Sequence, residues 1–556
     1  MRVSLPLWFQ SLTKTGYHRV HDEEEKEKEK IPHGGRGVLS RIRNSSSRVK
    51  IYAGMAIAFI FILSLNMSSG GPHLPISQHK EADAKYLHIL IPANKRDVNL
   101  CKTVASAAVL RYPIPTLVNW KKNFSDPVFG NVGDSHIGKI KGVLDYLNTF
   151  PADRDEDLVV LVDGYDIWFQ LRPETLLERY FDINQRADER VQKRLGKNAV
   201  KKEGIRQSIV FSAQKKCWPR DSDDPACFAA PESSLPKDIY GPLTDTKVDN
   251  EENEYIKFRP RYLNSGVMMG ELGSVKKFFN RSIEVMALGQ HKGSDQNVFS
   301  QIFGEQEFQR EVIRERYLTS SQRFARWLKS AFGMKEPSVL DPHPTHKLMA
   351  PADGSPFEYG IGLDYASALG HPTVFAEYDS EWIRYDDPSS IEQASKKLGI
   401  SPQHVHHLPD DIASSLPPFW SQNPMDDMLP FDRSWTNVSL HTNLWTTNVP
   451  AMIHHNAHLN GMKNLRQKSW DKVWFQPVLR QLLNAYVNEP YRAFAVLRNG
   501  DRETAWWSKY QKKWETHSDK ATHEWVSWKA LCGGEEFEKE LFRDSLGPWV
   551  PPRFDY

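Results

Sequence analysis

Apolar residues run without interruption from Leu158 to Val162, and two aspartates follow, Asp163 and Asp166. An uninterrupted run predicts a strand buried on both faces, as in a parallel sheet, because a half-exposed strand alternates apolar and polar residues. Ligands of open α/β sheets lie at the carboxyl ends of such strands. Gly164, between the two aspartates, leaves room for a ligand to approach the backbone.

Two carboxylates at one strand end repel each other unless a cation or a basic group neutralises them. Their position therefore predicts a hard divalent cation bound by Asp163 and Asp166, with open positions for phosphate oxygens. The alternative is that Asp163 opens a turn, while Asp166 caps the next helix or pairs with an arginine.

Strand and helix patterns alternate on both sides of this run, which predicts a layered α/β fold. Strand patterns cover residues 86–94, 116–120 and 208–213, and helical spacing of apolar residues covers 99–112, 136–147 and a segment that starts at Pro173. Residues 262–270 are apolar but interrupted by Asn-Ser-Gly, which is typical of backbone bent around a ligand. A helix is predicted to start near Asp295, where a capping or dipole role is the alternative to chemistry.

The second half of the chain has a less regular pattern. Residues 310–430 are rich in proline and polar turns, which is typical of a long insertion that serves as a lid or an acceptor platform. Residues 450–456 predict a final strand, and residues 470–556, rich in Trp, Lys and Glu, predict amphipathic helices packed on the core. The predicted catalytic domain thus covers residues 86–469, including the insertion, and a helical region follows it.

Residues 51–65 are apolar and uncharged, and five basic residues from Arg36 to Lys50 precede them with no acidic residue between. This asymmetry predicts a single transmembrane signal anchor at residues 51–67, with a cytosolic tail (1–50), a stem (68–85) and a lumenal catalytic domain. A buried core helix is the alternative. A cleaved signal peptide is disfavoured because about fifty residues precede the apolar run.

Composition adds further constraints. The formal net charge of +2 gives no support for nucleic-acid binding. The four cysteines contain no CxxC pair, which disfavours a structural zinc site. Cys217 and Cys227 are predicted to form a local disulfide in an oxidising compartment, and Cys101 and Cys532 either pair or stay reduced. Three N-glycosylation sequons fall on the predicted lumenal side, at Asn123, Asn280 and Asn437.

Four segments carry a resemblance to a known family and occur in the family's order. They are residues 161–166 (LVDGYD), 210–219 (VFSAQKKCWP), 262–266 (YLNSG) with Gly270, and 294–296 (SDQ). Together they resemble the glycosyltransferase domain of procollagen lysyl hydroxylases and of related procollagen galactosyltransferase-like proteins. The resemblance covers residues 86–305 and 450–463, and it implies a GT-A fold, a Rossmann-like mixed sheet flanked by helices.

The resemblance also implies a metal-dependent donor site. Asp163 and Asp166 would bind Mn²⁺ at the diphosphate of a UDP-sugar, and a histidine after the last strand would complete the metal site. The family pattern there is His-x-Asn-Gly. His454 fits the strand end and is preferred, whereas His458 fits the motif and is the second choice. Lys463 would contact the diphosphate in either case.

The remaining donor-site residues follow from the same resemblance. Those implied to lie at the donor sugar or to face the acceptor are Asn264, Ser265, Gly266, Asp295, Gln296 and Lys139. Those implied to lie at the uridine or between the metal ligands are Ile91, Ala93, Asn94, Gly164 and Tyr165.

The chemistry of glycosyl transfer fits these residue types. The diphosphate leaving group needs neutralisation, which a divalent ion and a lysine supply, and the acceptor hydroxyl needs a carboxylate, for which Asp295 is the candidate. The sequence thus predicts a type II membrane enzyme of the Golgi or ER that moves a hexose to a glycan or glycoprotein. The alternatives are an inactive GT-A-fold scaffold or binding protein tethered to the membrane, and a metal-dependent phosphoester hydrolase.

Overall fold

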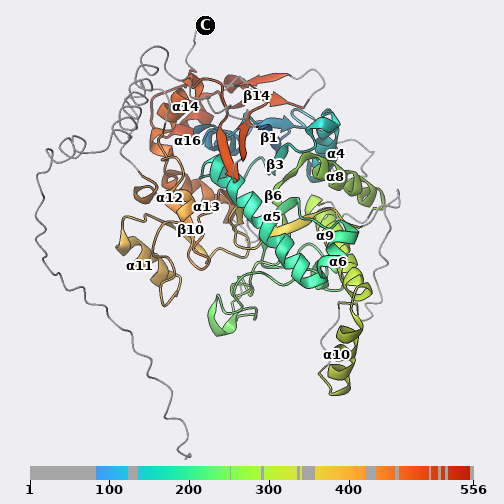
Figure 1. The fold of residues 1–556 in the computed structure, drawn as a ribbon. Helices are drawn as coiled ribbons and strands as arrows, with labels where there is room; N and C mark the ends of the chain where they lie inside the picture. Colours follow the sequence, from blue (N-terminus) through green and yellow to red (C-terminus); the bar gives the residue numbers. More distant parts are fainter. Residues whose placement is uncertain are drawn as a thin grey trace, which may run out of the picture. The chain divides into compact units, whose positions relative to one another are not determined.

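β3 (Leu158–Val162) lies inside a ten-stranded mixed sheet, with further strands on both sides (Figure 1). All five of its residues are buried, and they alternate between two apolar cores. Leu158, Val160 and Val162 belong to the first core, and the other two residues belong to the second. The prediction of a strand buried on both faces is therefore confirmed, as is the layered α/β class.

The computed structural model describes residues 83–122, 135–250, 252–289, 294–334, 339–340, 357–420, 434–456, 462–499, 502–510, 515–519 and 524–550. Within these ranges, no helix is both long and apolar enough to cross a membrane. The predicted tail, the anchor at 51–67 and the stem up to residue 82 lie outside the described residues, as do Asn123 and His458.

The main sheet has the order β15-β14-β2-β1-β3-β6-β5-β7, with β13 paired to β1 and β12 paired to β13. Its other members are β1 (Asp83–Pro92), β2 (Thr116–Val118), β5 (Ile209–Gln214), β6 (Tyr262–Glu271), β7 (Ile361–Asp364), β12 (Ala495–Asn499), β13 (Arg502–Trp507), β14 (Glu515–Ser518) and β15 (Trp525–Ser527). β1 runs parallel to both β2 and β3, whereas β6 runs antiparallel to β3 and β5. The carboxyl ends of β1 and β3 therefore meet the start of β6 at one edge of the sheet.

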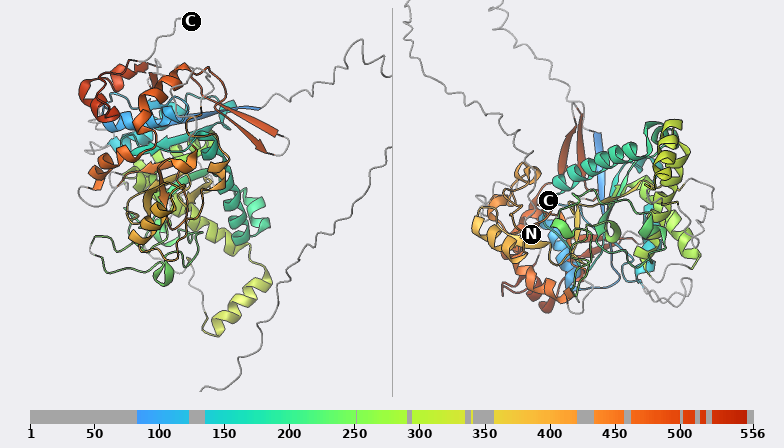
Figure 2. Two further views of the ribbon diagram at one scale, coloured as in Figure 1. Left: turned by 90° about the vertical axis from the view of Figure 1, so that its left-hand side faces the viewer. Right: turned by 90° about the horizontal axis from the view of Figure 1, so that it is seen from below.

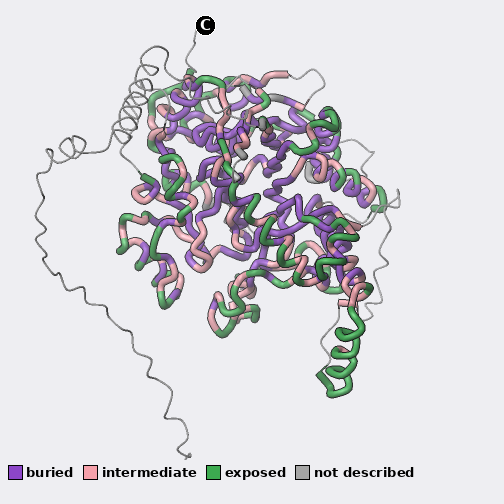
Figure 3. The backbone as a smooth tube through the Cα atoms, viewed as in Figure 1, coloured by how far each residue is buried: buried purple, intermediate pink, exposed green. Residues whose placement is uncertain are grey.

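Helices cover both faces of this sheet, and each face has its own apolar core (Figures 2 and 3). The first core contains side chains of α3 (Val98–Val109), α5 (Pro173–Leu195), α14 (Leu479–Asn488) and α16 (Glu535–Phe542). The second contains side chains of α4 (Ser135–Leu147), α8 (Leu272–Ala287) and α9 (Asp295–Arg316). The remaining helices are α6 (Lys197–Glu203), α7 (Pro225–Phe228), α10 (Ser320–Ala331), α11 (Pro388–Lys397), α12 (Asp410–Ala413), α13 (Met462–Ser469) and α15 (Trp528–Leu531).

Two small sheets lie beside the main one. One has the order β4-β11-β8, with β4 (Ile167–Phe169), β8 (Gly370–Pro372) and β11 (Met452–His454), and the other joins β9 (Ser380–Ile383) to β10 (Leu440–Asn443). β11 pairs antiparallel with β4, so that His454 faces Ile167. Because β4 directly follows Asp166 in the sequence, this pairing brings residue 454 to the end of β3.

The predicted helical region at 470–556 is wrong in its central part. β12 and β13 form a hairpin that lies beside the first half of β1, and β14 pairs with β2 (Figure 2). These strands are only three to six residues long, which is too short for a clear alternation of apolar and polar residues to show in the sequence. The predicted insertion at 310–430 also contributes to the sheets, because β7 pairs with β5 and β8 pairs with β11.

Two disulfides hold this unit together. Cys217 pairs with Cys227, and Cys101 of α3 pairs with Cys532, 431 residues later in the sequence. The second pair attaches the end of the chain to its first described helix. Of the two sequons that are described, Asn280 is exposed on α8 and Asn437 is half-buried.

The two large cores draw all their members from residues 87–549, and the chain divides into compact units between residues 81 and 82. A fragment that begins at Ala82 therefore keeps every described core contact, and it is the protein of choice for the experiments below.

We expect Leu161→Ala to lower the free energy of unfolding by about 2–5 kcal/mol, because it removes a fully buried side chain of β3 and leaves a cavity in the second core. Urea unfolding monitored by circular dichroism measures the change. The exposed Leu288→Ala serves as the matched control and should shift the value by less than about 0.5 kcal/mol. Equal effects of the two substitutions would contradict the assignment of β3 to the sheet centre.

We also expect stability to fall in mild acid. Burial lowers the pKa of His441 to about 3, so the folded state keeps this imidazole neutral while the unfolded state binds a proton below about pH 6.5. Stability from this residue is thus complete above pH 6.5 and decreases by about 1.4 kcal/mol per pH unit as the pH falls toward 3. Urea unfolding at pH 7.5, 6.5 and 5.5 should show a smaller decrease for His441→Phe than for the wild type; an identical decrease would refute the prediction.

Candidate metal centre

Three ligand side chains meet where β3 ends. Asp163 directly follows β3, and Asp166 directly precedes β4. The β4–β11 pairing supplies His454, and the backbone N–H of His455 donates to the carbonyl oxygen of Asp166 at 2.7 Å. The pairing of β4 with β11, two strands that are far apart in the sequence, therefore places His454 beside Asp163 and Asp166.

The distances within this cluster are short. His454 Nε2 lies 3.7 Å from Asp163 Oδ2 and 3.6 Å from Asp166 Oδ1. One ligand atom from each of the three residues lies within 4.8 Å of the others. Both histidine distances suit a single bridging ion, since protein ligands of Zn²⁺ and Ca²⁺ lie about 2.0–2.6 Å from the metal. His454 is buried, whereas the Asp163 side chain is 32% exposed, so the cluster opens to solvent on the Asp163 side.

The hydrogen bonds of Asn264 fix the tautomer of His454. Asn264 Oδ1 lies 3.1 Å from the backbone nitrogen of Gly266 and 3.1 Å from His454 Nδ1. A backbone N–H only donates, so the Asn264 atom that faces it is the amide oxygen, and His454 Nδ1 must carry the hydrogen. Because Nδ1 faces Asn264, Nε2 is the nitrogen that faces both carboxylates, which is the orientation of a metal-binding histidine.

Gly266 makes the space that this imidazole occupies. β5 and β6 lose register there, because Phe211 faces Met268 whereas the next residue, Ser212, faces Asn264. Residues 265–267 thus form a bulge, a feature common beside active sites. A Cβ on Gly266 would lie 2.1 Å from His454 Cε1. The backbone is bent as the sequence predicts, but the histidine ring occupies the space beside the glycine.

Lys139 of α4 connects this cluster to α9. Its ammonium group donates to Asp163 Oδ1 at 2.7 Å and to Asp295 Oδ2 at 2.8 Å, and its side chain is only 4% exposed. Burial lowers the pKa of Lys139, but the carboxylates of Asp163 and Asp295 outweigh burial and raise the pKa above its ordinary value. Lys139 is therefore a buried member of the cluster, although a lysine near the start of a helix is usually exposed. Lys141, two residues further on, is exposed and pairs with Asp145.

Gln296 supports the bulge from the first turn of α9. Its Oε1 accepts from Asn264 Nδ2 and from the Ser265 backbone N–H, both at 3.4 Å, and its Nε2 donates to the Trp218 carbonyl at 2.7 Å. Asp295, the first residue of α9, is buried against Lys139 rather than exposed as a simple helix cap. Asp295 therefore holds Lys139 in place, and Gln296 holds the bulge of β6.

Other predicted donor residues have different surroundings. A Cβ on Gly164 would lie 2.6 Å from the Pro92 carbonyl oxygen, so this glycine permits close packing of β3 on β1 and its interpretation as room for a ligand is wrong on that side. Tyr165 OH accepts from the Asn94 backbone N–H at 3.2 Å. Ile91 and Ala93 are buried in the first core. The side chain of Lys463 lies outside the described residues.

Gln214 is a residue of this network that sequence reasoning missed. Its Oε1 accepts from Asn264 Nδ2 at 2.9 Å, which fixes the asparagine from the side opposite His454. Gln214 is the last residue of β5, as Asp163 directly follows the last residue of β3. A polar residue at the end of an apolar strand was therefore the available signal.

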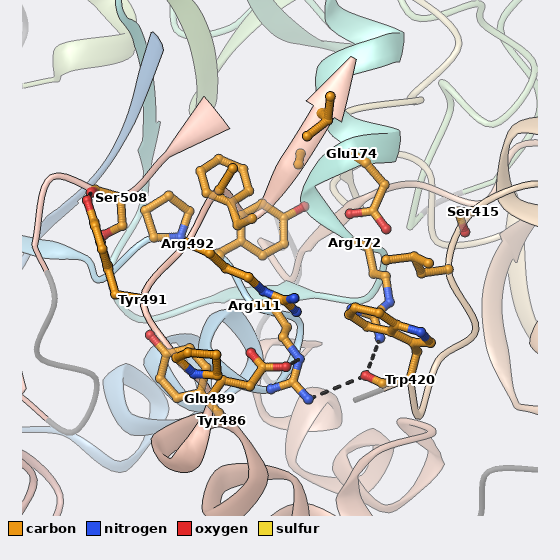
Figure 4. Close-up of a pocket in the computed structure, with 18 of the residues that line it drawn as sticks. Arg111, Arg172, Glu174, Ser415, Trp420, Tyr486, Glu489, Tyr491, Arg492 and Ser508 are labelled. Carbon is orange, nitrogen blue, oxygen red and sulfur yellow. Dashed lines mark hydrogen bonds and ion pairs between the residues drawn. The ribbon is translucent and has the colours of Figure 1, made fainter. Parts of the chain in front are cut away.

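A separate pocket of about 480 Å³ lies between the N-terminus of α5 and the C-terminal part of the chain (Figure 4). Two of its arginines make structural contacts. Arg111 pairs with Glu489 at 3.0 Å, and Arg172 Nη2 donates to the carbonyl of Trp420 at 3.1 Å. None of the donor-site residues whose side chains are described lines this pocket.

Comparison with known proteins gives no relative: no protein-family model and no curated protein matches this sequence. The basis for assigning a function is thus the geometry of the cluster. Two carboxylates, an imidazole of fixed tautomer and a buried ammonium group lie together at one edge of the sheet.

We expect Gly266→Ala to destabilise the protein by about 1–3 kcal/mol through the clash with the His454 ring. The matched background is His454→Ala, in which that ring is absent and the added methyl group has space. Urea unfolding of the wild type, both single variants and the double variant gives the coupling free energy. A cost of Gly266→Ala that is the same in both backgrounds would show that His454 does not occupy this space.

Proposed function

We propose that this chain is a metal-dependent glycosyltransferase of the GT-A type, which transfers a hexose from a UDP-sugar to a hydroxyl of a glycan or glycoprotein. The observation that carries the proposal is the convergence of Asp163, Asp166 and the Nε2 atom of His454. Two carboxylates that face one another across this distance repel unless a positive charge lies between them. The resemblance of the four sequence segments to a glycosyltransferase domain supports the choice of reaction.

The residues fit a divalent metal. Carboxylates suit Mn²⁺ and Mg²⁺, whereas imidazole suits the transition metals, so a set of two aspartates and one histidine favours Mn²⁺. Asp163, Asp166 and His454 would hold the ion, and the ion would neutralise the charge that develops on the diphosphate leaving group. Asn264 keeps His454 in the tautomer that this binding needs.

Lys139 has two roles in this proposal. Its ammonium group holds Asp163 through Oδ1, so that Oδ2 faces His454. The same positive charge would stabilise negative charge that develops on a diphosphate bound at Asp163, without reorganisation during the reaction. Asp295 keeps Lys139 in place from the other side. Its buried pairing with the lysine favours a positioning role, and the role of proton acceptor for the acceptor hydroxyl is the alternative.

The residues of the site argue against the two alternative functions, an inactive scaffold protein and a phosphoester hydrolase. A scaffold protein has no physical need for buried carboxylates and an ammonium group, whose desolvation costs free energy. A two-metal phosphoester hydrolase needs ligands for a second ion. Among the described residues, one cluster of His, Cys, Asp or Glu with metal-binding distances is found. Turnover of UDP-sugar that never requires an acceptor would nevertheless favour hydrolysis.

The proposed location is the lumen of the Golgi or ER, with the chain anchored by residues 51–67. Both disulfides support an oxidising compartment, where such bonds form and persist. The run of basic residues before the anchor supports a cytosolic N-terminus.

We expect the fragment from Ala82 to bind UDP in the presence of Mn²⁺ and not in its absence, because the diphosphate has few other partners at the cluster. Asp163→Asn, Asp166→Asn and His454→Ala should each weaken this binding by about a hundredfold or more. Titration calorimetry with UDP, with GDP as a second nucleotide, measures the affinity.

The control is Asp145→Asn, which removes an exposed carboxylate paired with Lys141 on α4 and should leave UDP binding unchanged. Absence of UDP binding with every metal tested would end the UDP-sugar proposal. GDP binding with the same dependence on the three ligands would retain the glycosyltransferase and change the donor.

A further inference from the structure

The pocket between α5 and the C-terminal part of the chain contains buried polar atoms that lack partners. Tyr112 is only 1% exposed, and its hydroxyl has no hydrogen-bond partner among the described residues. Glu174 Oε1 is also buried and makes no hydrogen bond within the described part of the chain. Both residues line this pocket. A buried polar group without a partner costs free energy, so the pocket has unused hydrogen-bonding capacity.

The walls of the pocket are fixed in place by polar contacts between distant segments. Arg111, just after α3, pairs with Glu489 at 3.0 Å, and Arg172, just before α5, donates to the Pro417 carbonyl oxygen at 2.9 Å. Burial and the nearby Glu174 carboxylate raise the pKa of Tyr112, so its side chain stays a neutral hydroxyl that donates and accepts. A concave space of about 480 Å³ with fixed walls is typical of a preformed ligand site.

The charges of the pocket restrict its ligand. Three arginines and four carboxylates line it. One of the carboxylates, Asp411, pairs with Arg179, which lies outside the lining. The remaining charges are equal in number and opposite in sign. This balance favours a neutral ligand over a phosphate, a sulfate or a cation, each of which needs a surplus of the opposite charge.

Aromatic side chains supply the apolar part of the lining, among them Trp420, Tyr486 and Phe494. The Arg492 guanidinium lies 5.4 Å from the centroid of the Trp420 ring (Figure 4). A ligand must therefore present an apolar face and, beside it, groups that donate and accept hydrogen bonds. A pyranose combines both in one compact ring, because its C–H groups form the faces and its hydroxyls project from the rim. A concave pocket suits this shape better than that of an extended peptide.

We infer that this pocket binds a neutral sugar residue of a glycan, with the sugar ring against the aromatic wall and its hydroxyls at Tyr112 and Glu174. The pocket shares no described residue with the candidate metal centre, so the inference does not rest on the proposed function. In a glycosyltransferase, the pocket would recognise a part of the acceptor glycan other than the hydroxyl that reacts.

The test is a titration of the fragment from Ala82 with lactose, cellobiose, maltose and chitobiose, followed by saturation-transfer NMR. The neutral peptide N-acetyl-Gly-Ser-Gly-amide is the comparison probe. The buffer contains EDTA and no UDP, so the result does not depend on the metal centre. We expect at least one disaccharide to bind and the peptide not to bind. Absence of binding by all four disaccharides, whether or not the peptide binds, overturns the inference.

Tyr112→Phe separates a ligand-binding role from a structural one. It removes a hydroxyl without a described partner, so the urea midpoint should stay the same or rise, whereas the disaccharide affinity should fall about tenfold, roughly the value of one hydrogen bond. Trp420→Ala should also weaken binding, through loss of the aromatic wall.

The matched control is Tyr180→Phe, which removes a buried hydroxyl that donates to the Ser208 carbonyl oxygen at 2.8 Å and does not line the pocket. This variant should lower the urea midpoint and leave disaccharide binding unchanged. Disaccharide binding that is equal in the wild type and in Tyr112→Phe would place the sugar elsewhere and overturn the inference.

Discussion

The buried ammonium group of Lys139 is the interaction on which the candidate site depends. It contacts the end of β3 through Asp163, the start of α9 through Asp295, and the carbonyl of Ser265 in the β6 bulge. A charge removed from water is stable only when its partners are equally fixed, so the three elements hold one another in register. The metal-binding geometry is a consequence of this arrangement, because Asp163 is shared between the ammonium group and the histidine side of the cluster.

A second constraint acts from the opposite side and is purely geometric. Asn264 accepts from the backbone N–H of Gly266 and from His454. Because Gly266 has no side chain, the imidazole occupies the space beside it. Gln214 and Gln296 hold the asparagine in turn. His454 is thus oriented by a network of side-chain amides, whereas Asp163 is oriented by the positive charge of Lys139. Both kinds of support are typical of sites that must be organised before a substrate binds.

The sequence predicts those parts of this arrangement that depend on local pattern. The apolar run of β3 identifies a strand buried on both faces, and the strand end identifies Asp163 and Asp166 as a pair. The pairing of β11 with β4 has no local signal, because strand partners are chosen by tertiary packing across hundreds of residues. Choosing His454 on its position at a strand end agrees with the observed cluster. The same absence of local signal explains the missed strands β12–β15, which are only three to six residues long.

The pairing of β13 with β1 gives the chain an order of assembly. β1 is the first described strand, yet the partner of its first half is made near the end of synthesis, and the Cys101–Cys532 disulfide joins positions 431 residues apart. During synthesis, the early part of β1 therefore presents an open edge until almost the whole protein has left the ribosome. Such an edge pairs readily with other chains. A chain that is truncated before β13 therefore leaves the first half of β1 without this partner, as an open edge to which other chains can pair.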